Sequence, residues 1–427
     1  MNQTVWPGPR SGQVRIPASK SRAHRLLICA ALAGRQTTLI CQGISRDIQA
    51  TADCLREMGS EIRMEGECIS VFPLRPKKEE TVLLPCGESG STLRFLLPVA
   101  GSLGLKGCFR MEGRLPERPL HPLWEVLEAH DMRLRQEKEL LYFEGQLSAG
   151  EYAIPGNISS QYISGLLFAL PLLRGESKLT VTGPLESADY VRMTEDALTL
   201  FGFSFEKKGY QYRIPGCGTA RKAGESPWVL PVEADWSSAA FLLAMGALSP
   251  EGICVEGLDM HSSQGDRQIL TLLEGFGAKV ERTERGILVR KGALRGMEID
   301  AAGIPDLVPV LAAVAALAEG ETTIRHAERL RLKESDRLQT TSAMLSALGA
   351  EIRETEDGLW IRGKPFLRGG KVSSFRDHRI AMAASVAAGL CREPVIIEEA
   401  ECTEKSFPKY WELLQELKTD SGIFELN

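Results

Sequence analysis

The sequence lacks an excess of basic residues: 51 Lys and Arg stand against 56 Asp and Glu, which gives a net charge of -5. Because proteins that bind nucleic acids are usually basic, this balance argues against a nucleic-acid partner. The sequence also has no unbroken apolar run of about 18 residues, the length that a membrane-spanning helix requires. We therefore expect a cytoplasmic protein that binds neither nucleic acid nor membrane.

Cysteine and histidine are present, but not in the patterns typical of metal sites. None of the ten cysteines forms a C-x-x-C pair, and the six histidines form no H-x-x-x-H pair. We interpret the cysteines as reduced, mostly buried thiols and expect no metal site. The nucleotide-binding motif G-x-x-x-x-G-K-[ST] is also absent.

Two patterns recur along the chain at regular intervals. A helix end, a turn and a short strand occur five times, with turn residues 72, 71, 75 and 72 positions apart: Gly59, Asp131, Gly202, Gly277 and Gly349. Six times a polar cluster precedes an Ala/Leu-rich run, at intervals of 70, 69, 76, 70 and 71 residues. Runs that are apolar on all sides are typical of buried helices. The sequence therefore predicts an α/β protein of six repeats, three in each of two domains, with the break near residues 221–227.

Each predicted buried helix begins at a polar cluster. The N-terminus of a helix presents free N–H groups and a partial positive charge of about half a unit. Three such helix starts on one face of each domain would favour anions, so we expect a site for anionic ligands.

The clusters contain charged residues that also have simpler interpretations. In "RLKESDRL", Lys333 and Arg337 are four residues apart and could share one face of a solvated helix. Asp306 could be only a helix cap, and Arg118 a surface residue in an extended or turn segment. In "PASKSRAHR" we expect Arg22 and His24 to be solvated neighbours without a role. The recurrence of such clusters at one phase of the repeat favours a functional role for the others.

Several motifs, in one order from about residue 14 to 410, resemble those of the 3-phosphoshikimate 1-carboxyvinyltransferase (EPSP synthase) family of enolpyruvyl transferases. They are "PASKS" with Arg25, "GESGSTLR", "ERPL", "SSQ", "SADY", "DWSSAAF", "SSQGD", "IPD", "KESDR", "DHR" and "CTEKSFP". The resemblance implies a two-domain enolpyruvyl transferase fold, each domain three βαβαββ repeats around buried helices, which closes over its ligands. It also implies a discontinuous second domain, so we expect domains of residues 19–227 and of 1–18 plus 228–427.

The implied reaction transfers the carboxyvinyl group of phosphoenolpyruvate to the 5-hydroxyl of shikimate 3-phosphate through a tetrahedral intermediate, and releases phosphate. By motif, shikimate 3-phosphate would be bound by Lys20, Ser21, Arg25, Ser159, Ser160, Gln161, Ser187, Asp306 and Lys333. Phosphoenolpyruvate would be bound by Lys20, Gly90, Arg118, Gln161, Arg337, Arg379 and Lys405. Asp306 is the expected base on the hydroxyl and Glu334 the acid/base at the methylene carbon, while Lys20 contacts both substrates. The resemblance implies no metal or organic cofactor, and we expect a monomer.

Two positions depart from the family pattern, and other functions remain open. Glu88 precedes the expected anion site, where it could cap the helix or pair with Arg94, and Arg329 replaces a common Asn. The Gly at position 90 is typical of glyphosate-sensitive members of the family, but the preceding residues Glu88 and Ser89 differ from the common pattern. The alternatives are a UDP-N-acetylglucosamine enolpyruvyl transferase, disfavoured by Gly113 where that family has a reactive Cys, an RNA 3′-phosphate cyclase-like protein, and an inactive anion-binding module.

Overall fold

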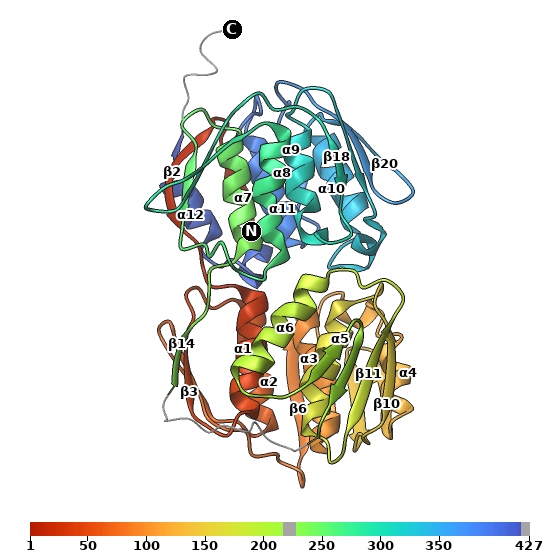
Figure 1. The fold of residues 1–427 in the computed structure, drawn as a ribbon. Coiled ribbons are helices and arrows are strands. Elements are labelled where there is room, and N and C mark those ends of the chain that lie inside the picture. Colours follow the sequence, from red (N-terminus) through yellow and green to blue (C-terminus); the bar gives the residue numbers. More distant parts are fainter. Residues whose placement is uncertain (217–227, 420–427) are drawn as a thin grey trace. The chain divides into compact units, whose positions relative to one another are not determined.

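The computed structural model describes residues 1–216 and 228–419, so the predicted break at residues 221–227 lies outside the described residues. The chain divides into two compact units (Figure 1). The N-terminal unit comprises Lys20–Val232, and the C-terminal unit comprises Met1–Ser19 and Glu233–Asn427. The boundary after Val232 lies later in the chain than the expected residue 227. The reason is that strand β14 (Trp228–Pro231) pairs with β3 (Thr37–Ile40) of the N-terminal unit.

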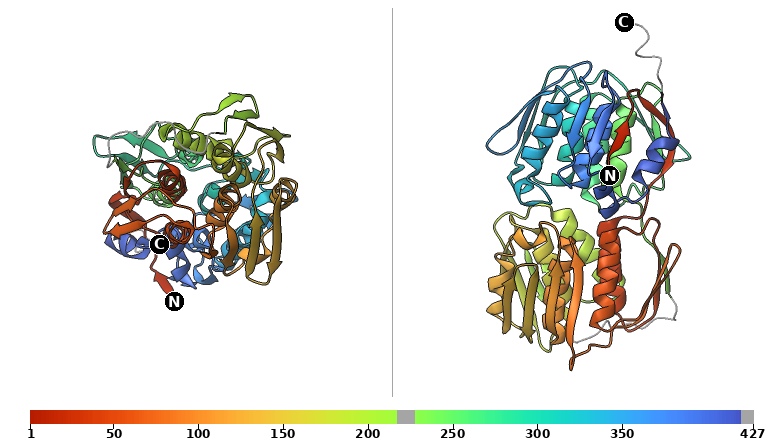
Figure 2. Two further views of the ribbon diagram at one scale, coloured as in Figure 1. Left: turned by 90° about the horizontal axis from the view of Figure 1, so that it is seen from below. Right: turned by 180° about the vertical axis from the view of Figure 1, so that it is seen from behind.

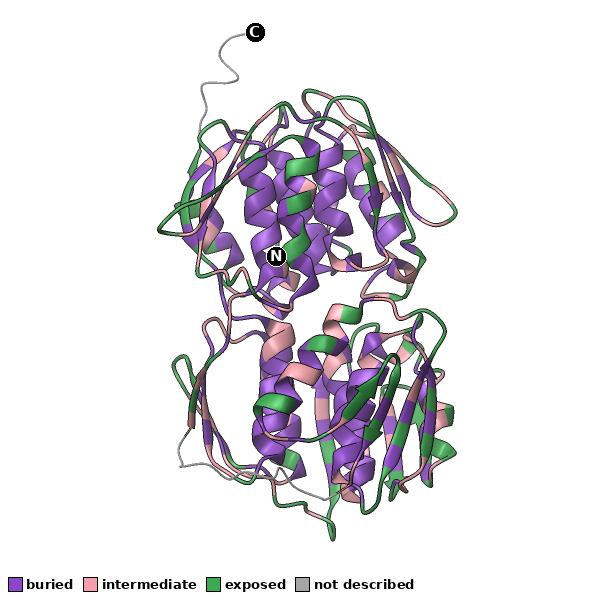
Figure 3. Cartoon of the chain, viewed as in Figure 1, coloured by how far each residue is buried: buried purple, intermediate pink, exposed green. Residues whose placement is uncertain are grey.

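In the N-terminal unit the helices form a closed ring of contacts. Around the ring, each contacting the next, lie α1 (Lys20–Leu32), α2 (Arg46–Met58), α3 (Gly90–Leu103), α5 (Ser160–Ala169) and α6 (Ala188–Leu200). Helices α3 and α5 are buried almost throughout, whereas α2 and α6 bury one face (Figure 3). The short elements α4 (Leu123–Glu128), η1 (Leu115–Glu117) and η2 (Leu170–Leu172) complete this unit's helical segments.

Three sheets complete the described part of the N-terminal unit. The first has the order β14, β3, β5 (Cys68–Val71) and β4 (Ile62–Glu65). The second has the order β6 (Thr81–Gly87), β7 (Lys106–Met111), β9 (Leu140–Gly145) and β8 (Met132–Glu137). The third has the order β10 (Glu151–Pro155), β11 (Ser177–Thr182), β13 (Gln211–Ile214) and β12 (Glu206–Lys208).

In the C-terminal unit three buried helices pack against one another: α7 (Trp236–Ala247), α9 (Val308–Ala315) and α11 (His378–Ala388). More exposed segments surround them: α8 (Ile269–Phe276), α10 (Arg337–Ala347), α12 (Tyr410–Glu416), η3 (Gly265–Gln268), η4 (Pro305–Leu307), η5 (Glu328–Leu332) and η6 (Ala400–Lys405). The described part of this unit also has three sheets. Their orders are β16 (Lys279–Arg282), β17 (Ile287–Arg290), β15 (Ile253–Glu256), β2 (Arg10–Arg15), β24 (Lys418–Thr419); β18 (Glu298–Asp300), β19 (Glu321–Arg325), β21 (Leu359–Arg362), β20 (Glu351–Glu354); and β1 (Gln3–Val5), β23 (Val395–Glu398), β22 (Gly370–Ser373).

The repeat appears in how the strands around each buried helix pair with one another. Figure 2 gives two further views of the ribbon. In four repeats the strand before the buried helix pairs in parallel with the strand after it, as β6 does with β7 across α3. The strands before α1 and α7 are exchanged instead: β2 pairs with β15, and β14 pairs with β3. The two segments that link the units are themselves hydrogen-bonded, through Ser19 N to Glu233 O and Asp235 N to Pro17 O.

The regular spacing of the turns has a backbone cause. All five predicted turn residues have positive φ, from 73° at Asp131 to 115° at Gly59. A helix commonly ends with a residue in this left-handed region, where Gly has no steric penalty and Asp is tolerated. Each of these five repeats therefore reverses direction at the same point before its hairpin.

The α/β fold of two units built from repeats around buried helices is confirmed by this architecture. Among the nine described cysteines all are free and five are buried, as expected for reduced thiols. In the described residues no helix is both long and apolar enough to cross a membrane.

Candidate active site

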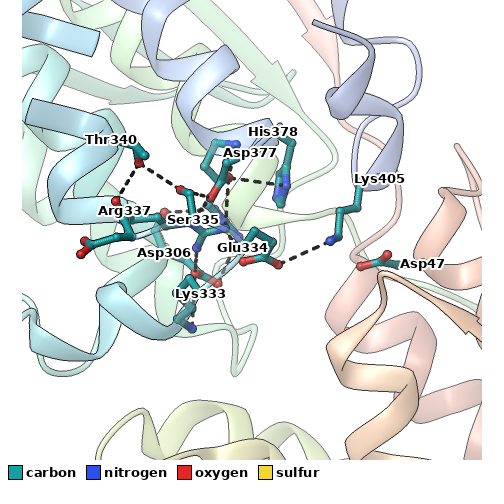
Figure 4. Close-up of polar contacts among 12 residues, drawn as sticks. Asp47, Asp306, Lys333, Glu334, Ser335, Arg337, Thr340, Asp377, His378 and Lys405 are labelled. Atoms are coloured by element: carbon teal, nitrogen blue, oxygen red, sulfur yellow. Dashed lines mark hydrogen bonds and ion pairs between the residues drawn. The ribbon is translucent and has the colours of Figure 1, made fainter. Parts of the chain in front are cut away.

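In the C-terminal unit, three carboxylates surround the buried guanidinium of Arg337 (Figure 4). Its Nη1 donates to Asp306 Oδ1 at 2.8 Å, its Nη2 to Glu334 Oε2 at 2.9 Å, and its Nε to Asp377 Oδ2 at 2.8 Å. Burial lowers the pKa of Arg337, but the three carboxylates outweigh burial and raise it. Arg337 is therefore a permanently charged centre that fixes the positions of three acids.

Asp306 lies among cations. Besides Arg337, Arg379 Nη2 lies 3.1 Å from Asp306 Oδ2, and Lys333 Nζ lies 3.8 Å from Oδ1. Burial alone would raise the pKa of Asp306, but Arg379, Lys333 and Arg337 lower it well below its usual range. Although the sequence allowed a simple helix cap at Asp306, no side-chain cap bond is made at η4 or α9. Its carboxylate is an ionised group held by cations.

Two lysines lie at the edge of this cluster. Burial, opposed by Asp306 and assisted by Arg337, lowers the pKa of Lys333 to about 8. Lys405, at the end of η6, is buried with its Nζ 4.0 Å from Glu334 Oε1. Both amino groups thus lie beside a carboxylate that the sequence assigned to proton transfer.

The expectation that Lys333 and Arg337 share a helical face is wrong. Helix α10 begins at Arg337, and Lys333 lies before it in extended conformation at the end of η5. The helix begins there because Asp336 is its N-cap and accepts from Gln339 N at 3.2 Å. The non-helical segment 333–336 lets Lys333, Glu334 and Arg337 all approach Asp306 or one another.

A carboxyl group that sequence reasoning missed lies close by. Asp266 is 2% exposed and accepts from the Ser237 hydroxyl at the start of α7. Burial, and then the charge of Asp306, raise the pKa of Asp266 to about 7, against the opposing effects of Arg379 and Ser237. Asp266 is in the "SSQGD" motif, but its position beside Asp306 depends on tertiary packing.

In the N-terminal unit, Arg25 is buried without a counterion. Its Nε donates to Thr194 Oγ1 at 2.8 Å, and its Nη1 and Nη2 donate to the carbonyl oxygens of Ser21 and Tyr190 at 2.7 and 2.8 Å. Within the described residues no carboxylate forms an ion pair with it. Burial consequently lowers the pKa of Arg25.

The start of α1 is joined to the start of α2 by an ion pair. Lys20 Nζ lies 2.9 Å from Asp47 Oδ2, and both side chains are largely buried. Asp47 was not predicted, because α2 is not one of the buried helices whose starts recur in the sequence. The ion pair fixes Lys20 at the first turn of α1.

The start of α3 lies beneath two arginines. A Cβ placed on Gly90 would lie 2.4 Å from Arg94 Nη1 and 2.9 Å from Arg118 Nη1, so only glycine fits without moving them. Arg94 Nη1 also donates to Gln161 Oε1 at 3.1 Å, and Gln161 Nε2 donates to Ser91 Oγ at 3.0 Å. The structure thus brings together Gly90, Arg118 and Gln161, and adds Arg94 and Ser91.

The remaining predicted serines are at helix starts. Ser159 caps α5, accepting from Gln161 N at 3.3 Å, and Ser160 is the first residue of that helix. Ser187 precedes α6 and is buried, with a left-handed φ of 52°. Their hydroxyls lie where helix N–H groups favour an anion.

Two expectations about neighbouring residues are corrected, and Arg329 is given a contact. His24 is not solvated but fully buried, and Arg22 donates to Met193 O at 3.2 Å. Glu88 does not cap α3, since Ser89 does, and Glu88 lies instead against Gly113. Arg329 donates to Ala302 O at 2.8 Å.

Asp377, in the "DHR" motif, has a role that the sequence did not assign. Its carboxylate accepts hydrogen bonds from Ser335 as well as from Arg337.

This arrangement of cations and carboxylates agrees with the similarity of the chain to known proteins. The family model for EPSP synthase (3-phosphoshikimate 1-carboxyvinyltransferase) matches residues 6–414. The chain belongs to the EPSP synthase family. A curated relative from Clostridium kluyveri, named 3-phosphoshikimate 1-carboxyvinyltransferase, is 42% identical over 96% of this chain and 95% of its own. A relative of the same name from Clostridium perfringens is 41% identical over 99% and 98%.

A solved EPSP synthase from Acinetobacter baumannii has the same fold. It is 25% identical, with a TM-score of 0.78 over 98% of this chain and 100% of that one. Membership in the EPSP synthase family confirms the resemblance drawn from the motifs. It also decides against the UDP-N-acetylglucosamine transferase and the RNA cyclase-like protein as alternatives. Which residues bind each substrate stays a prediction.

Proposed function

We propose that the Arg337 cluster and the Arg25, Lys20 and Gly90 positions bind and convert the two anionic substrates of the EPSP synthase reaction. As a member of this family, the chain transfers the carboxyvinyl group of phosphoenolpyruvate to the 5-hydroxyl of shikimate 3-phosphate. The products are 5-enolpyruvylshikimate 3-phosphate, an intermediate on the way to chorismate and the aromatic amino acids, and phosphate. Addition requires one proton to be added at the methylene carbon and one to leave the hydroxyl. Elimination then requires one proton to be removed from the resulting methyl carbon as phosphate leaves, which restores the vinyl group.

The observation that best supports these roles is Asp306, an ionised carboxylate held by Arg337 and Arg379 with Lys333 nearby. A carboxylate with so low a pKa is a weak base as long as the neighbouring cations interact with it alone. Bound phosphate and carboxylate groups share those cations, which raises the basicity of Asp306 when both substrates are present. Asp306 therefore becomes an effective base on the hydroxyl only in the loaded enzyme.

Glu334 is the proposed acid/base at the methylene carbon of phosphoenolpyruvate. Arg337 holds one of its oxygens, and Lys405 lies near the other. Both cations are also proposed ligands of phosphoenolpyruvate, together with Arg379, so the carboxylate would lie beside the reacting carbon. A positioned acid/base typically contributes about 10²–10⁴-fold to the rate.

Shikimate 3-phosphate is assigned to Lys20, Ser21, Arg25, Lys333 and Asp306, with Ser159, Ser160, Gln161 and Ser187. Arg25 supports this assignment most clearly, because it is a buried cation without a carboxylate partner in the described residues. A phosphate would supply the missing charge. Phosphoenolpyruvate is assigned to Gly90, Arg118 and Gln161 together with Lys20 and the cations of the Arg337 cluster.

The reaction is tested by measuring phosphate release from phosphoenolpyruvate with shikimate 3-phosphate or UDP-N-acetylglucosamine as acceptor. We expect turnover with shikimate 3-phosphate alone. Turnover only with the sugar nucleotide would overturn the proposal. Asp306→Asn and Glu334→Gln should each lose about 10²–10⁴-fold in kcat while still binding shikimate 3-phosphate. Full activity of either variant would remove that residue from proton transfer.

The same proposal includes a cytoplasmic, monomeric enzyme that needs no metal or organic cofactor. Among the described residues no group of three or more His, Cys, Asp or Glu side chains could hold a metal ion. Gly90 lies against the guanidinium groups of Arg94 and Arg118, where a side chain would displace them, and it resembles the Gly of glyphosate-sensitive members, so we also propose inhibition by glyphosate.

A further inference from the structure

A chain of four buried polar side chains joins three helices of the N-terminal unit. His24 Nδ1 lies 2.6 Å from Thr51 Oγ1, which lies 2.7 Å from Thr92 Oγ1, which donates to Ser89 Oγ at 2.7 Å. All four residues are 0% exposed. His24 belongs to α1, Thr51 to α2, and Thr92 to α3, which Ser89 caps. We call these four residues the His24 chain.

Two members of the His24 chain lie beside a residue with a proposed role, Lys20 or Gly90, and a third lies beside Asp47, the ion-pair partner of Lys20. His24 follows Lys20 by four positions and Thr51 follows Asp47 by four, so each lies one turn along the same helix face. Ser89 immediately precedes Gly90. Helices α1 and α2 are thus joined twice, by Lys20 and Asp47 at the first turn and by His24 and Thr51 at the second.

The hydrogen bonds of the His24 chain can run in only one direction. The Thr92 hydroxyl donates to Ser89, so it must accept from Thr51, whose hydroxyl in turn must accept from His24 Nδ1–H. Because a neutral imidazole carries a single N–H and the network places it on Nδ1, Nε2 carries no proton; it is buried and has no hydrogen-bond partner in the described residues. Burial, with Lys20 and Arg25 and against Asp47, lowers the pKa of His24 to about 3. The imidazole is therefore a neutral donor whose tautomer is assigned from the network.

The hydrogen bonds of Arg25 do not involve this chain. They go to Ser21 of its own helix and to Thr194 and Tyr190 of α6. Its guanidinium also lies 5.0 Å from the ring centroid of Phe95 on α3. Breaking the His24 chain would thus move Lys20 and the Gly90 turn relative to each other while leaving the anchors of Arg25 in place.

We propose that the His24 chain consists of positioning residues that fix Lys20 and the Gly90 turn for phosphoenolpyruvate. None of its members touches substrate. This inference rests on the proposed binding of phosphoenolpyruvate by Lys20 and Gly90. It requires that loss of a hydroxyl inside the chain weakens use of phosphoenolpyruvate more than binding of shikimate 3-phosphate.

The test is Thr51→Val, which keeps the side-chain shape but removes the central hydroxyl. We expect kcat/KM for phosphoenolpyruvate to fall about 10- to 100-fold, since small displacements of positioning groups have effects of this size. The Kd of shikimate 3-phosphate should rise by less than this, by no more than the roughly tenfold that one 1.4 kcal/mol interaction carries, because Lys20 is only one of its proposed ligands. Thr51→Ser restores the hydroxyl and should restore near wild-type kinetics.

A matched control is Thr37→Val on β3, because Thr37 is also fully buried and its hydroxyl has no hydrogen-bond partner in the described residues. This variant should behave like the wild type. Unchanged kinetics in folded Thr51→Val, or equal losses for both substrates, would overturn the proposal.

A second measurement is independent of activity and of the variant's folding. In ¹⁵N-labelled wild-type protein, the His24 ring should show a protonated Nδ1 and a bare Nε2 at every pH from 5 to 9. An Nε2–H tautomer, or a titration in this range, would overturn the His24 chain as described. If wild-type protein releases no phosphate with shikimate 3-phosphate, the assigned reaction fails, but this spectroscopic test still stands.

Discussion

Arg25 and Arg337 are two buried arginines with opposite surroundings. Arg25 is bound by a hydroxyl and two carbonyl oxygens, all neutral, whereas Arg337 is bound by three carboxylates. Burial lowers the pKa of Arg25, but the acids raise that of Arg337 against the same effect of burial. The difference matches the two tasks proposed for them: Arg25 would bind an anionic ligand that supplies the opposite charge, and Arg337 would position acids for proton transfer.

The comparison predicts the largest change when Arg337 is replaced by methionine. Removing one partner of a buried ion pair leaves uncompensated charge, which typically lowers the free energy of unfolding by about 3–5 kcal/mol. Without Arg337 the neighbouring carboxylates gain protons more easily, so the loss should shrink as the pH falls from 8 to 5.5. Urea unfolding of wild type and Arg337→Met at both pH values measures this, and activity should be undetectable.

Arg331→Met is the control, because Arg331 also bonds two carboxylates, Asp336 and Glu354, but is partly exposed. An exposed pair of this kind contributes about 0–1 kcal/mol. Equal destabilisation by the two substitutions would show that burial of the Arg337 cluster does not matter as described.

Arg25→Met should have the reverse profile, with a smaller effect on stability and a clear effect on binding. The substitution removes a buried charge that no carboxylate compensates, so the unfolding free energy should change much less than in Arg337→Met. The Kd of shikimate 3-phosphate should rise about 10- to 100-fold, since a charge-assisted hydrogen bond contributes about 1.5–3 kcal/mol. Calorimetric titration of the folded variant with shikimate 3-phosphate provides the measurement.

Arg22→Met provides the matched control, three residues earlier on α1 and bonded to Met193 O and Asp196. It should bind shikimate 3-phosphate like the wild type. A loss of affinity as large as that in Arg25→Met would mean that general positive charge on α1, and not the buried guanidinium, attracts the ligand.

Sequence reasoning predicted what depends on local order and repetition. The turn residues recur because each ends a helix in the left-handed region, and the polar clusters recur because each begins a buried helix. Asp336 followed by Gln339 is a capping pattern, so the start of α10 at Arg337 could also have been predicted.

The remainder depends on tertiary contacts that spacing does not encode. Asp377 lies 40 residues after Arg337, and the chain from His24 to Ser89 crosses three helices. The exchange of β2 and β14 joins strands more than 180 residues from the ones they pair with. Residues of this kind become visible only once the helices are packed.

Lys333 offers the finest test of the comparison, because it belongs to the Arg337 cluster but its pKa is lowered, as that of Arg25 is. Burial lowers its pKa from 10.5 to about 8, so protonated Lys333 makes the folded state less stable below pH 8, and this cost disappears as the pH rises toward 10.5. In the proposed assignment shikimate 3-phosphate binds the protonated form of Lys333, so its affinity should fall by up to about tenfold between pH 8 and pH 9, with uptake of a proton on binding. Calorimetry in buffers of different ionisation enthalpy measures both quantities. Lys333→Met should bind shikimate 3-phosphate more weakly at pH 7 and lose this pH dependence. If the pH dependence persists in the variant, another group titrates. Lys333 would then be held in its charged form by Asp306 as firmly as Arg337 is by its three acids.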